Sequence, residues 1–218
     1  MNQLLQSLDT SAFAKEIMRQ VDRRPFYLTK EEAYSDKPSA FYGGQTISAP
    51  HMHAKAIEYL SPVLKPGNHI LDIGSGSGYL TTCFAKAVTV NNENPKDRGK
   101  VIGIDVVPES IEKSRTVVNQ YFPELLKYNT YNRHFQFIEK DGKYGHPKQS
   151  NDELYDGIHI GAASDNIPYD IFTQLARGGF LVLPLKTGSH HTFTIVHKDH
   201  KGNISIELKE TVNYVPLV

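Results

Sequence analysis

Cysteine and tryptophan are nearly missing from this sequence, which has one cysteine, Cys83, and no tryptophan. A single cysteine excludes a disulfide within the chain, and with it the class of small secreted domains that disulfides stabilise. Cys83 falls on the apolar side of a predicted helix, so we expect a small core residue rather than a nucleophile. A reducing compartment, the cytoplasm, is the expected location.

An excess of charge of either sign is also lacking, because 24 Lys and Arg balance 24 Asp and Glu. This balance argues against a nucleic-acid partner and against an anionic membrane surface. No apolar run approaches the roughly 18 residues of a membrane span, and residues 1–23 lack the apolar core of a signal peptide. With 39% hydrophobic and 22% charged residues among 218, we expect one folded domain over residues 1–218, and a monomer.

The most informative stretch covers residues 69–87, HILDIGSGSGYLTTCFAKA. A short apolar run containing Asp72 precedes three alternate glycines, and a helix-compatible segment follows them. Strand, glycine turn and helix in this order open a nucleotide-binding β-α unit. Glycines there permit positive φ and let the backbone approach a ligand closely. A glycine-rich turn without any ligand is the alternative interpretation.

The spacing of the glycines distinguishes two kinds of cofactor. A dinucleotide fingerprint is G-x-G-x-x-G, with pyrophosphate at the helix N-terminus. This chain has D-x-G-x-G-x-G instead, and Tyr79 stands where the third dinucleotide glycine would be. Asp72, two residues before Gly74, does not suit a pyrophosphate but suits a ligand with hydroxyl or ammonium donors. The pattern resembles the first motif of class I S-adenosylmethionine-dependent methyltransferases, which have a Rossmann-like fold.

Apolar periodicity along the chain alternates strands with helices. It predicts helices over residues 12–21, 50–60, 79–87, 109–121 and 167–175. It predicts strands over residues 70–73, 100–105, 135–139, 155–160 and 180–185, and then an antiparallel hairpin of residues 192–197 and 204–208. This order indicates an α/β fold: a doubly wound, mostly parallel seven-stranded sheet that ends in a C-terminal antiparallel hairpin.

Two segments fall outside this alternation. Residues 23–48 have few regular signals but several aromatic side chains, and irregular segments of this length are usually functional. We expect them to form a lid, so that residues 1–50 supply an N-terminal helix and a substrate or lid segment, and residues 51–218 the cofactor-binding core. Residues 91–99 are polar and predict a surface insertion.

Acids stand at the carboxyl ends of three consecutive predicted strands, namely Asp72, Asp105 and Asp141. In a doubly wound sheet these ends form the ligand site. Asp105 is expected to accept hydrogen bonds from ribose hydroxyls, and Asp141 with Gly142 to face the adenine edge. Asp72 is expected near the methionine part of the cofactor. For any one of these acids taken alone, a cap or turn role is the alternative.

Longer matches narrow the resemblance to one family, the protein-L-isoaspartate (D-aspartate) O-methyltransferases. TISAPHMH over residues 46–53 is the most specific of these matches, whereas the glycine motif over residues 70–78 is shared by the superfamily. The others follow in order: VIGID at 101–105, DG at 141–142, HIGAA at 159–163, GG at 178–179, LP at 183–184 and YVPL at 214–217. The resemblance implies methyl transfer to the carboxylate of isoaspartyl residues in damaged proteins and peptides, which initiates their repair.

The resemblance also implies which residues form the site. Ser48 matches the serine counted as catalytic. The cofactor, S-adenosylmethionine, and its product, S-adenosylhomocysteine, would be bound by Gln45, Thr46, Ile47, His53, Asp72, Gly74, Ser75, Gly76, Ser77, Gly78, Asp105, Glu112, Asp141 and Gly142. The peptide substrate would contact Thr46, Ser48, Tyr214, Val215, Pro216 and Leu217.

The reaction itself limits what Ser48 has to do. An isoaspartyl carboxyl group with a pKa near 4 is already ionised at pH 7, so it is a nucleophile without a general base. We therefore interpret Ser48 as a hydrogen-bond donor that aims one carboxylate oxygen, and not as a covalent nucleophile. Orientation and water exclusion would supply most of the rate.

Other interpretations of these residues stay open. Ser48, a histidine at 51 or 53, and Asp72 could form a hydrolase triad, although no G-x-S-x-G elbow surrounds the serine. His51-x-His53 could begin a metal site, although residues two apart on a helix point to different faces, and we expect no metal. His159 is either a satisfied strand-end residue or a substrate-side one. The fold could also bind S-adenosylmethionine without catalysis, or methylate a small molecule or RNA.

Overall fold

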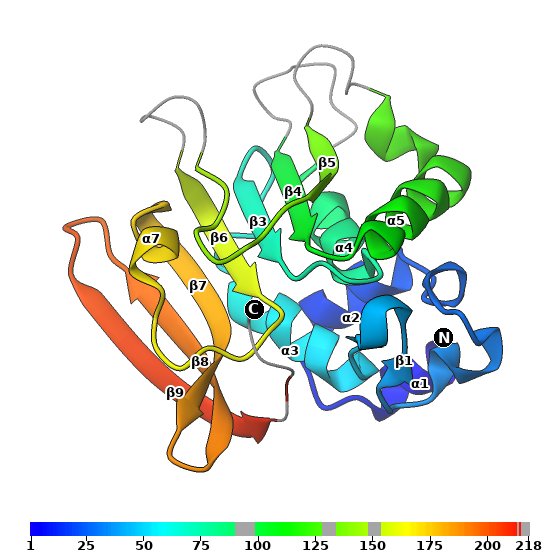
Figure 1. Cartoon of the computed structure of the whole chain (residues 1–218), viewed down its shortest axis with the longest axis horizontal. Coiled ribbons are helices and arrows are strands. Elements are labelled where there is room, and N and C mark those ends of the chain that lie inside the picture. Colours follow the sequence, from blue (N-terminus) through cyan, green and yellow to red (C-terminus); the bar gives the residue numbers. More distant parts are fainter. Residues whose placement is uncertain (90–98, 128–133, 148–153, 213, 215–218) are drawn as a thin grey trace.

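The computed structural model describes residues 1–89, 99–127, 134–147, 154–212 and 214. Seven strands form one sheet in the order β5-β4-β3-β6-β7-β8-β9, which confirms the predicted mostly parallel sheet (Figure 1). Within the described residues, no helix is both long and apolar enough to cross a bilayer.

The sheet reverses its strand order at its centre. β3 (His69–Ile73) pairs in parallel with β4 (Lys100–Asp105) on one side and with β6 (Tyr155–Ile160) on the other. β5 (Phe135–Glu139) extends the sheet beyond β4. In sheets of this type, ligands bind outside the carboxyl ends of the strands at such a switch point.

The C-terminal part of the sheet is the predicted hairpin. β7 (Leu175–Thr187) pairs in parallel with β6, and then in antiparallel with β8 (His190–Lys198), which pairs with β9 (Ile204–Val212). The β8–β9 turn closes where Gly202 adopts a φ of 93°, a value that glycine tolerates without strain. These strands lie on the left of Figure 1, with β9 at the edge of the sheet.

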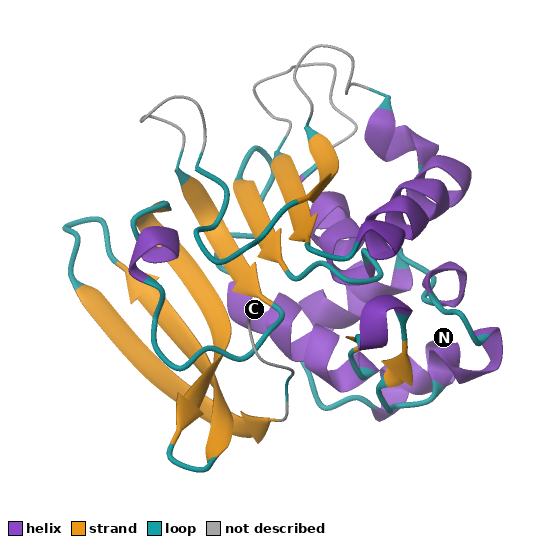
Figure 2. Ribbon diagram, in the orientation of Figure 1, coloured by secondary structure: helices purple, strands orange, loops and turns teal. Residues whose placement is uncertain are grey.

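Helices cover both faces of the sheet (Figure 2). One core combines the N-terminal helices α1 (Asn2–Ser7) and α2 (Ala12–Arg19) with α3 (Pro50–Leu60), α4 (Tyr79–Val88) and α5 (Pro108–Tyr121). On the opposite face, Ile171 of α7 (Tyr169–Phe172) packs against apolar side chains of the sheet. Proline occupies the first turn of α3 and of α5, where its missing N–H leaves no helical bond unmade.

The predicted lid segment is built from short pieces. It contains the 3-10 helices η1 (Arg24–Phe26), η2 (Lys30–Tyr34) and η3 (Tyr42–Gly44). A two-stranded ribbon of β1 (Ser39–Ala40) and β2 (Thr46–Ile47) completes it.

A further 3-10 helix, η5 (Pro123–Leu126), follows α5. Of the predicted insertion at 91–99, residues 91–98 lie outside the described residues.

The helix predicted over residues 167–175 is wrong in length. Only Tyr169–Phe172 is helical, and Leu175 already belongs to β7. Pairing with β6 prevails over the helical periodicity, because Leu175 pairs with Tyr155 and the Tyr155 N–H donates to the Gln174 carbonyl. The Gln174 side chain bonds the backbone of Tyr144 and His146, which holds this segment against the loop after β5.

Candidate active site

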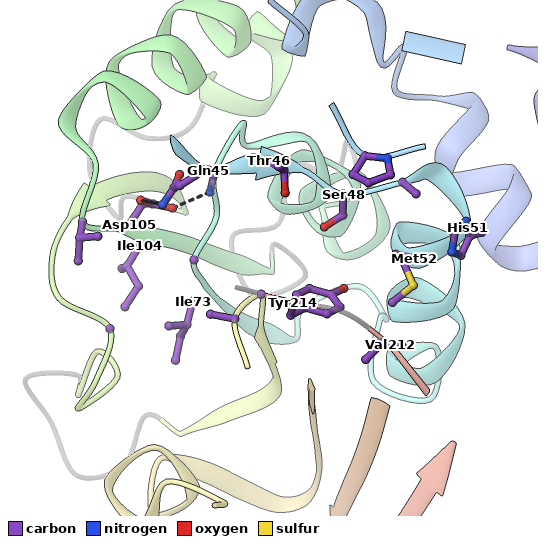
Figure 3. Close-up of a pocket in the computed structure, with 18 of the residues that line it drawn as sticks. Gln45, Thr46, Ser48, His51, Met52, Ile73, Ile104, Asp105, Val212 and Tyr214 are labelled. Atoms are coloured by element: carbon purple, nitrogen blue, oxygen red, sulfur yellow. Dashed lines mark hydrogen bonds between the residues drawn. The ribbon is translucent and has the colours of Figure 1, made fainter. Parts of the chain in front are cut away.

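A cavity of about 620 Å³ opens at the carboxyl edge of the sheet (Figure 3). Ile73 and Ile104, at the ends of β3 and β4, line one side of it. Another side is lined by Gln45, Thr46, Ser48, Ala49, His51 and Met52. Val212 and Tyr214 close it from the C-terminal end of β9. Its volume falls in the range of about 300–1,000 Å³ that small-molecule sites occupy.

The glycine turn after β3 forms one wall of this cavity. The Gly74 and Ser75 N–H groups donate to the Ile104 carbonyl at 2.9 and 3.0 Å, which ties the turn to β4. Gly76 has a φ of 50°, and a Cβ built on it meets no atom within 4 Å. A side chain there would therefore occupy the open space that a ligand needs. At Gly78, by contrast, a Cβ would lie only 2.6 Å from Ser114 Oγ, so this glycine is needed for packing within the protein.

Asp105 ends β4 and is almost fully buried, with 3% of its surface exposed. Its Oδ2 accepts from the Gly76 N–H at 2.8 Å, and its Oδ1 accepts from Gln45 Nε2 at 3.1 Å and from the Val107 N–H at 2.9 Å. One carboxylate thus joins the glycine turn to the lid segment at the cavity wall. Figure 3 shows Gln45 and Asp105 meeting on this side.

Ser48 and Tyr214 meet on the other side of the cavity, close to Met52 (Figure 3). The Ser48 hydroxyl is within hydrogen-bonding contact of the Tyr214 phenol. Burial raises the pKa of Tyr214, and the Ser48 hydrogen bond opposes that rise. The phenol therefore keeps its proton at neutral pH and can act as a donor. The Ser48 backbone is fixed by the buried Arg23, whose Nη2 donates to the Ser48 carbonyl at 3.0 Å.

A smaller chamber of about 40 Å³ adjoins the cavity and shares Thr46, Ser48, Gly74, Gly76, Gly161 and Tyr214 with it. Its other lining residues are mostly polar, and they include Ser75, Ser77, His53, Asp72 and His159. His53 comes from α3, and Asp72 and His159 are paired neighbours on β3 and β6. Burial, and then the nearby charge of Arg23, hold the pKa of His53 well below its usual value.

The two histidines of the HMH segment point apart. His51 is exposed and bonds Asp36, with 2.9 Å between Nδ1 and Oδ1. His53 is buried, and its Nδ1 accepts from Arg23 at 2.8 Å. Asp72 bonds His159 rather than either of them. Across the part of the chain that the structure describes, no three His, Cys, Asp or Glu side chains gather as a possible metal site.

Comparison with known proteins identifies the family of this chain. The chain matches the family described as Protein-L-isoaspartate(D-aspartate) O-methyltransferase (PCMT) over residues 2–218. The chain belongs to the PCMT family. The predicted family is therefore confirmed.

Curated PCMT relatives match nearly the whole chain. The Protein-L-isoaspartate O-methyltransferase of Triticum aestivum is 38% identical over 203 residues, which cover 93% of this chain and 82% of that protein. The Caenorhabditis elegans enzyme of the same name is 36% identical over 205 residues, with coverage of 94% and 84%. A Plasmodium falciparum protein assigned to PCMT, solved in complex with S-adenosyl-L-homocysteine, superimposes with a TM-score of 0.86. It is 32% identical and covers 99% of this chain, which covers 97% of it.

Most of the residues predicted for the PCMT site come together. The two connected cavities are lined by Gln45, Thr46, Ile47, Ser48, His53, Asp72, Gly74, Ser75, Gly76, Ser77, Asp105, Gly142 and Tyr214. Glu112 is exposed on α5, and Asp141 is exposed and accepts from the Lys143 N–H in its own turn, so neither lines them. Val215, Pro216 and Leu217 lie outside the described residues.

Sequence reasoning missed several lining residues of the cavity, among them Pro38, Met52, Lys140, Ala162 and Glu210. Met52 lies within the TISAPHMH match, so its position was a usable signal. Glu210 had no such signal. It belongs to β9, where its Oε2 accepts from the Tyr59 hydroxyl at 2.6 Å, and no local pattern predicts that this strand reaches the cavity.

Proposed function

We propose that this protein transfers a methyl group from S-adenosylmethionine to the free carboxylate of L-isoaspartyl and D-aspartyl residues in damaged proteins and peptides, which initiates their repair. The observation that carries the proposal is the shared cavity. In this member of the PCMT family, the Gly76 turn and Asp105 open into the same space as Ser48 and Tyr214. A cofactor bound against Gly76 and Asp105 therefore lies next to a substrate bound against Ser48 and Tyr214.

The chain's own residues fit the cofactor. Because Gly76 has no Cβ, the open space above it lets a ligand lie directly against the backbone. Asp105 offers carboxylate oxygens to ribose hydroxyls, while Gln45 and the Gly76 N–H hold that carboxylate in place. Thr46, Ile47 and His53 face the methionine end, and Gly142 the adenine. Gly78, Glu112 and Asp141 do not line the cavity in this structure, and their contacts with the cofactor stay predictions.

The main task of the protein in this reaction is to position the carboxylate and the methyl group. When bound, S-adenosylmethionine supplies an electrophilic methyl group on a sulfonium sulfur. Ser48 donates its hydroxyl hydrogen to one oxygen of the isoaspartyl carboxylate and leaves the other free to attack. Tyr214 lines the cavity beside Ser48 and keeps its phenol proton, so it can donate a second hydrogen bond to the substrate. Holding the reactants in line is worth roughly 7–11 kcal/mol in well-oriented pairs.

The N-terminal part of the chain is the part that excludes water from the cavity. Residues 1–50 form the substrate and lid segment of a single methyltransferase domain, and residues 51–218 form its cofactor-binding core. Pro38, Gln45 and Thr46 support this division, because they already line the cavity from the lid side. The peptide lies along Thr46, Ser48 and residues 214–217, where Tyr214 reaches the cavity.

The protein works as a cytoplasmic monomer without a nucleic-acid or membrane partner. The balanced charge supports this, since a basic surface is what such partners select. The single cysteine supports the reducing compartment, because it leaves no disulfide within the chain. Size-exclusion chromatography with light scattering tests the monomer.

The position of the transferred methyl group tests the function. A peptide with one isoaspartyl residue and a free C-terminal carboxyl is incubated with enzyme and S-adenosylmethionine, and the product is fragmented in a mass spectrometer. We expect the methyl group on the isoaspartyl carboxylate alone. Methylation of the C-terminal carboxyl, or of both groups equally, would contradict the proposal.

A further inference from the structure

Glu210 brings a carboxylate to the end of the main cavity where the substrate is expected. Val212, two residues further along β9, lies beside Tyr214 on the side away from Asp105 (Figure 3). The charge of Glu210 also acts on the Tyr214 phenol: burial raises the pKa of Tyr214 most, and the Glu210 carboxylate adds to that rise. Glu210 therefore belongs to the same end of the cavity as Ser48.

A β-bulge turns Glu210 toward this cavity. The pairing of β9 with β8 shifts by one residue between Leu208 and Thr211, so Lys209 and Glu210 together stand opposite a single residue of β8. Successive side chains of a regular strand point to opposite faces, whereas a bulge re-aims them. Both side chains here reach Tyr59 of α3: Lys209 Nζ lies 5.5 Å from the centre of its ring, and Glu210 bonds its hydroxyl. The bulge thus carries Glu210 to the α3 side of the sheet.

The Glu210 carboxylate is only half satisfied among the described residues. Its Oε2 accepts from the Tyr59 hydroxyl at 2.6 Å, whereas its Oε1 is buried without a hydrogen bond. Buried polar atoms are nearly always bonded, and a carboxylate that has lost its water costs more free energy than an unpaired neutral group. Since Glu210 lines the cavity, a donor for Oε1 can come from a ligand there.

Positive charge is missing beside Glu210, although it is present beside the acids nearby. Burial raises the pKa of Tyr59 most, and neighbouring carboxylates raise it further, namely those of Glu210, Glu58 and Glu207. Two of these acids have a cation of their own, in the ion pairs Lys55–Glu58 and Lys209–Glu207. Glu210 forms no ion pair with any residue that the structure describes.

The other ionisable groups of the cavity lining have their places elsewhere. Lys140 follows β5 at the cofactor end, where its N–H donates to the Asp105 carbonyl at 2.8 Å. His51 is bonded to Asp36 of the lid segment. A cation for Glu210 therefore has to arrive with the ligand.

We propose that Glu210 is a specificity-determining residue that binds a cationic group carried by the substrate next to its isoaspartyl residue. This group is the side chain of a flanking lysine or arginine, or the α-ammonium of an N-terminal isoaspartyl residue. The cation also offsets the repulsion between Glu210 and the carboxylate that is methylated. The inference rests on the proposed function and adds to it a preference among isoaspartyl substrates.

Glu210→Gln removes the charge and keeps the local structure. The amide oxygen can still accept from the Tyr59 hydroxyl, and the side chain keeps its length. Glu109→Gln is the matched control, because it removes the same charge from an exposed residue in the first turn of α5 that does not line the cavity. Calorimetry with S-adenosylhomocysteine should give the wild-type affinity for both variants, which shows that both are folded.

The test is steady-state methylation of isoaspartyl peptides that are capped at both ends. Lysine, glutamine or glutamate stands at one of the two positions before or the two positions after the isoaspartyl residue, and all other residues are identical. At one or more of these positions, we expect the wild type to favour lysine over glutamine about tenfold in kcat/KM, and glutamine over glutamate. Glu210→Gln should lose this preference, and Glu109→Gln should keep it.

A further pair of peptides distinguishes the two sources of the cation. Both begin with the isoaspartyl residue, and one has a free amino group whereas the other is acetylated. A wild-type preference for the free amine that is lost in Glu210→Gln assigns the cation to the α-ammonium. The same preference in the lysine peptides assigns it to a flanking side chain.

The inference is overturned if the wild type methylates all these peptides equally well, or if Glu210→Gln keeps the wild-type preference. It is also overturned if Glu210→Gln lowers kcat/KM equally for every peptide, as expected of a residue that only supports Tyr59. Weaker binding of S-adenosylhomocysteine by Glu210→Gln would overturn it by placing Glu210 in the cofactor site. A wild-type protein that methylates none of the peptides would instead contradict the proposed function, and this inference with it.

Discussion

Arg23 donates a hydrogen bond to Nδ1 of His53 at 2.8 Å, and both side chains are buried beneath the active-site cavity. The other acceptors of the guanidinium are the Ala33 and Ser48 carbonyls and the Tyr27 hydroxyl. The ring of Tyr79 lies 4.4 Å from the guanidinium carbon. These uncharged partners stabilise the cation without neutralising it, so His53 stays unprotonated beside it.

This relationship predicts a pH dependence of stability. A free histidine titrates near pH 6.5, whereas the pKa of His53 in the folded protein lies well below that value. Below about pH 6.5 the unfolded chain binds a proton that the folded chain does not. The free energy of unfolding should therefore fall as the pH falls, by about 1.4 kcal/mol per pH unit from this group.

His53→Asn measures that contribution, because asparagine accepts from Arg23 but does not titrate. Urea unfolding between about pH 5 and pH 7 should show a shallower pH dependence in the variant than in the wild type. His190→Asn should keep the wild-type dependence, since solvent surrounds that residue. Parallel curves for His53→Asn and the wild type would contradict the prediction.

Arg23→Lys should destabilise the protein, although it keeps the charge. A lysine ammonium cannot reach acceptors on three sides as the planar guanidinium does, so buried acceptors lose their partners. We expect a loss of about 3 kcal/mol in the free energy of unfolding, measured by urea titration. Arg24→Lys is the matched control on the exposed neighbour and should change stability little. Equal stability of the two variants would show that the Arg23 hydrogen bonds contribute nothing.

Gly76→Ala should separate stability from cofactor binding. Gly76 and Gly188 both have positive φ, 50° and 69°, and a Cβ on either meets no atom within 4 Å. Alanine at each should therefore cost about 1 kcal/mol of stability, for the left-handed backbone alone. Only Gly76→Ala should lose affinity for S-adenosylhomocysteine in calorimetry, because only its methyl group enters the cavity. Equal affinity of both variants would remove Gly76 from the cofactor site.

Ser48→Ala should lower kcat by about 10- to 100-fold, the worth of one hydrogen bond to a charged group. The dissociation constant of S-adenosylhomocysteine should stay unchanged, because the hydroxyl acts on the substrate. Tyr214→Phe, which removes only the phenol hydroxyl beside Ser48, should have a smaller effect on kcat. Steady-state kinetics with an isoaspartyl peptide, beside calorimetry, checks both variants. A matching loss of cofactor affinity would assign Ser48 to the cofactor pocket instead.

Local sequence was sufficient where a pattern is local. The glycine turn, the strand over residues 100–105 and the hairpin follow from spacing within about a dozen residues, and all three are present. The helix over residues 167–175 failed because pairing of Leu175 with Tyr155, a partner far away in the sequence, prevails over its periodicity.

The tautomers of the site depend on contacts that no local pattern contains. Arg23 reaches His53 across 30 residues, and Asp72 reaches His159 across 87. Asp72 was predicted from its place in the glycine motif to lie at the methionine end of the cofactor. The structure shows Asp72 lining the smaller chamber, where its carboxylate bonds His159 and Thr81. Register between β3 and β6, which sets Asp72 beside His159, is a property of the folded sheet.

The most direct test of the account is methyl transfer from labelled S-adenosylmethionine to two peptides that differ only in carrying an isoaspartyl or a normal aspartyl linkage. The account predicts label in the isoaspartyl peptide and none above background in its partner. Equal labelling of both peptides, or labelling of neither by a protein that binds S-adenosylhomocysteine, would contradict it.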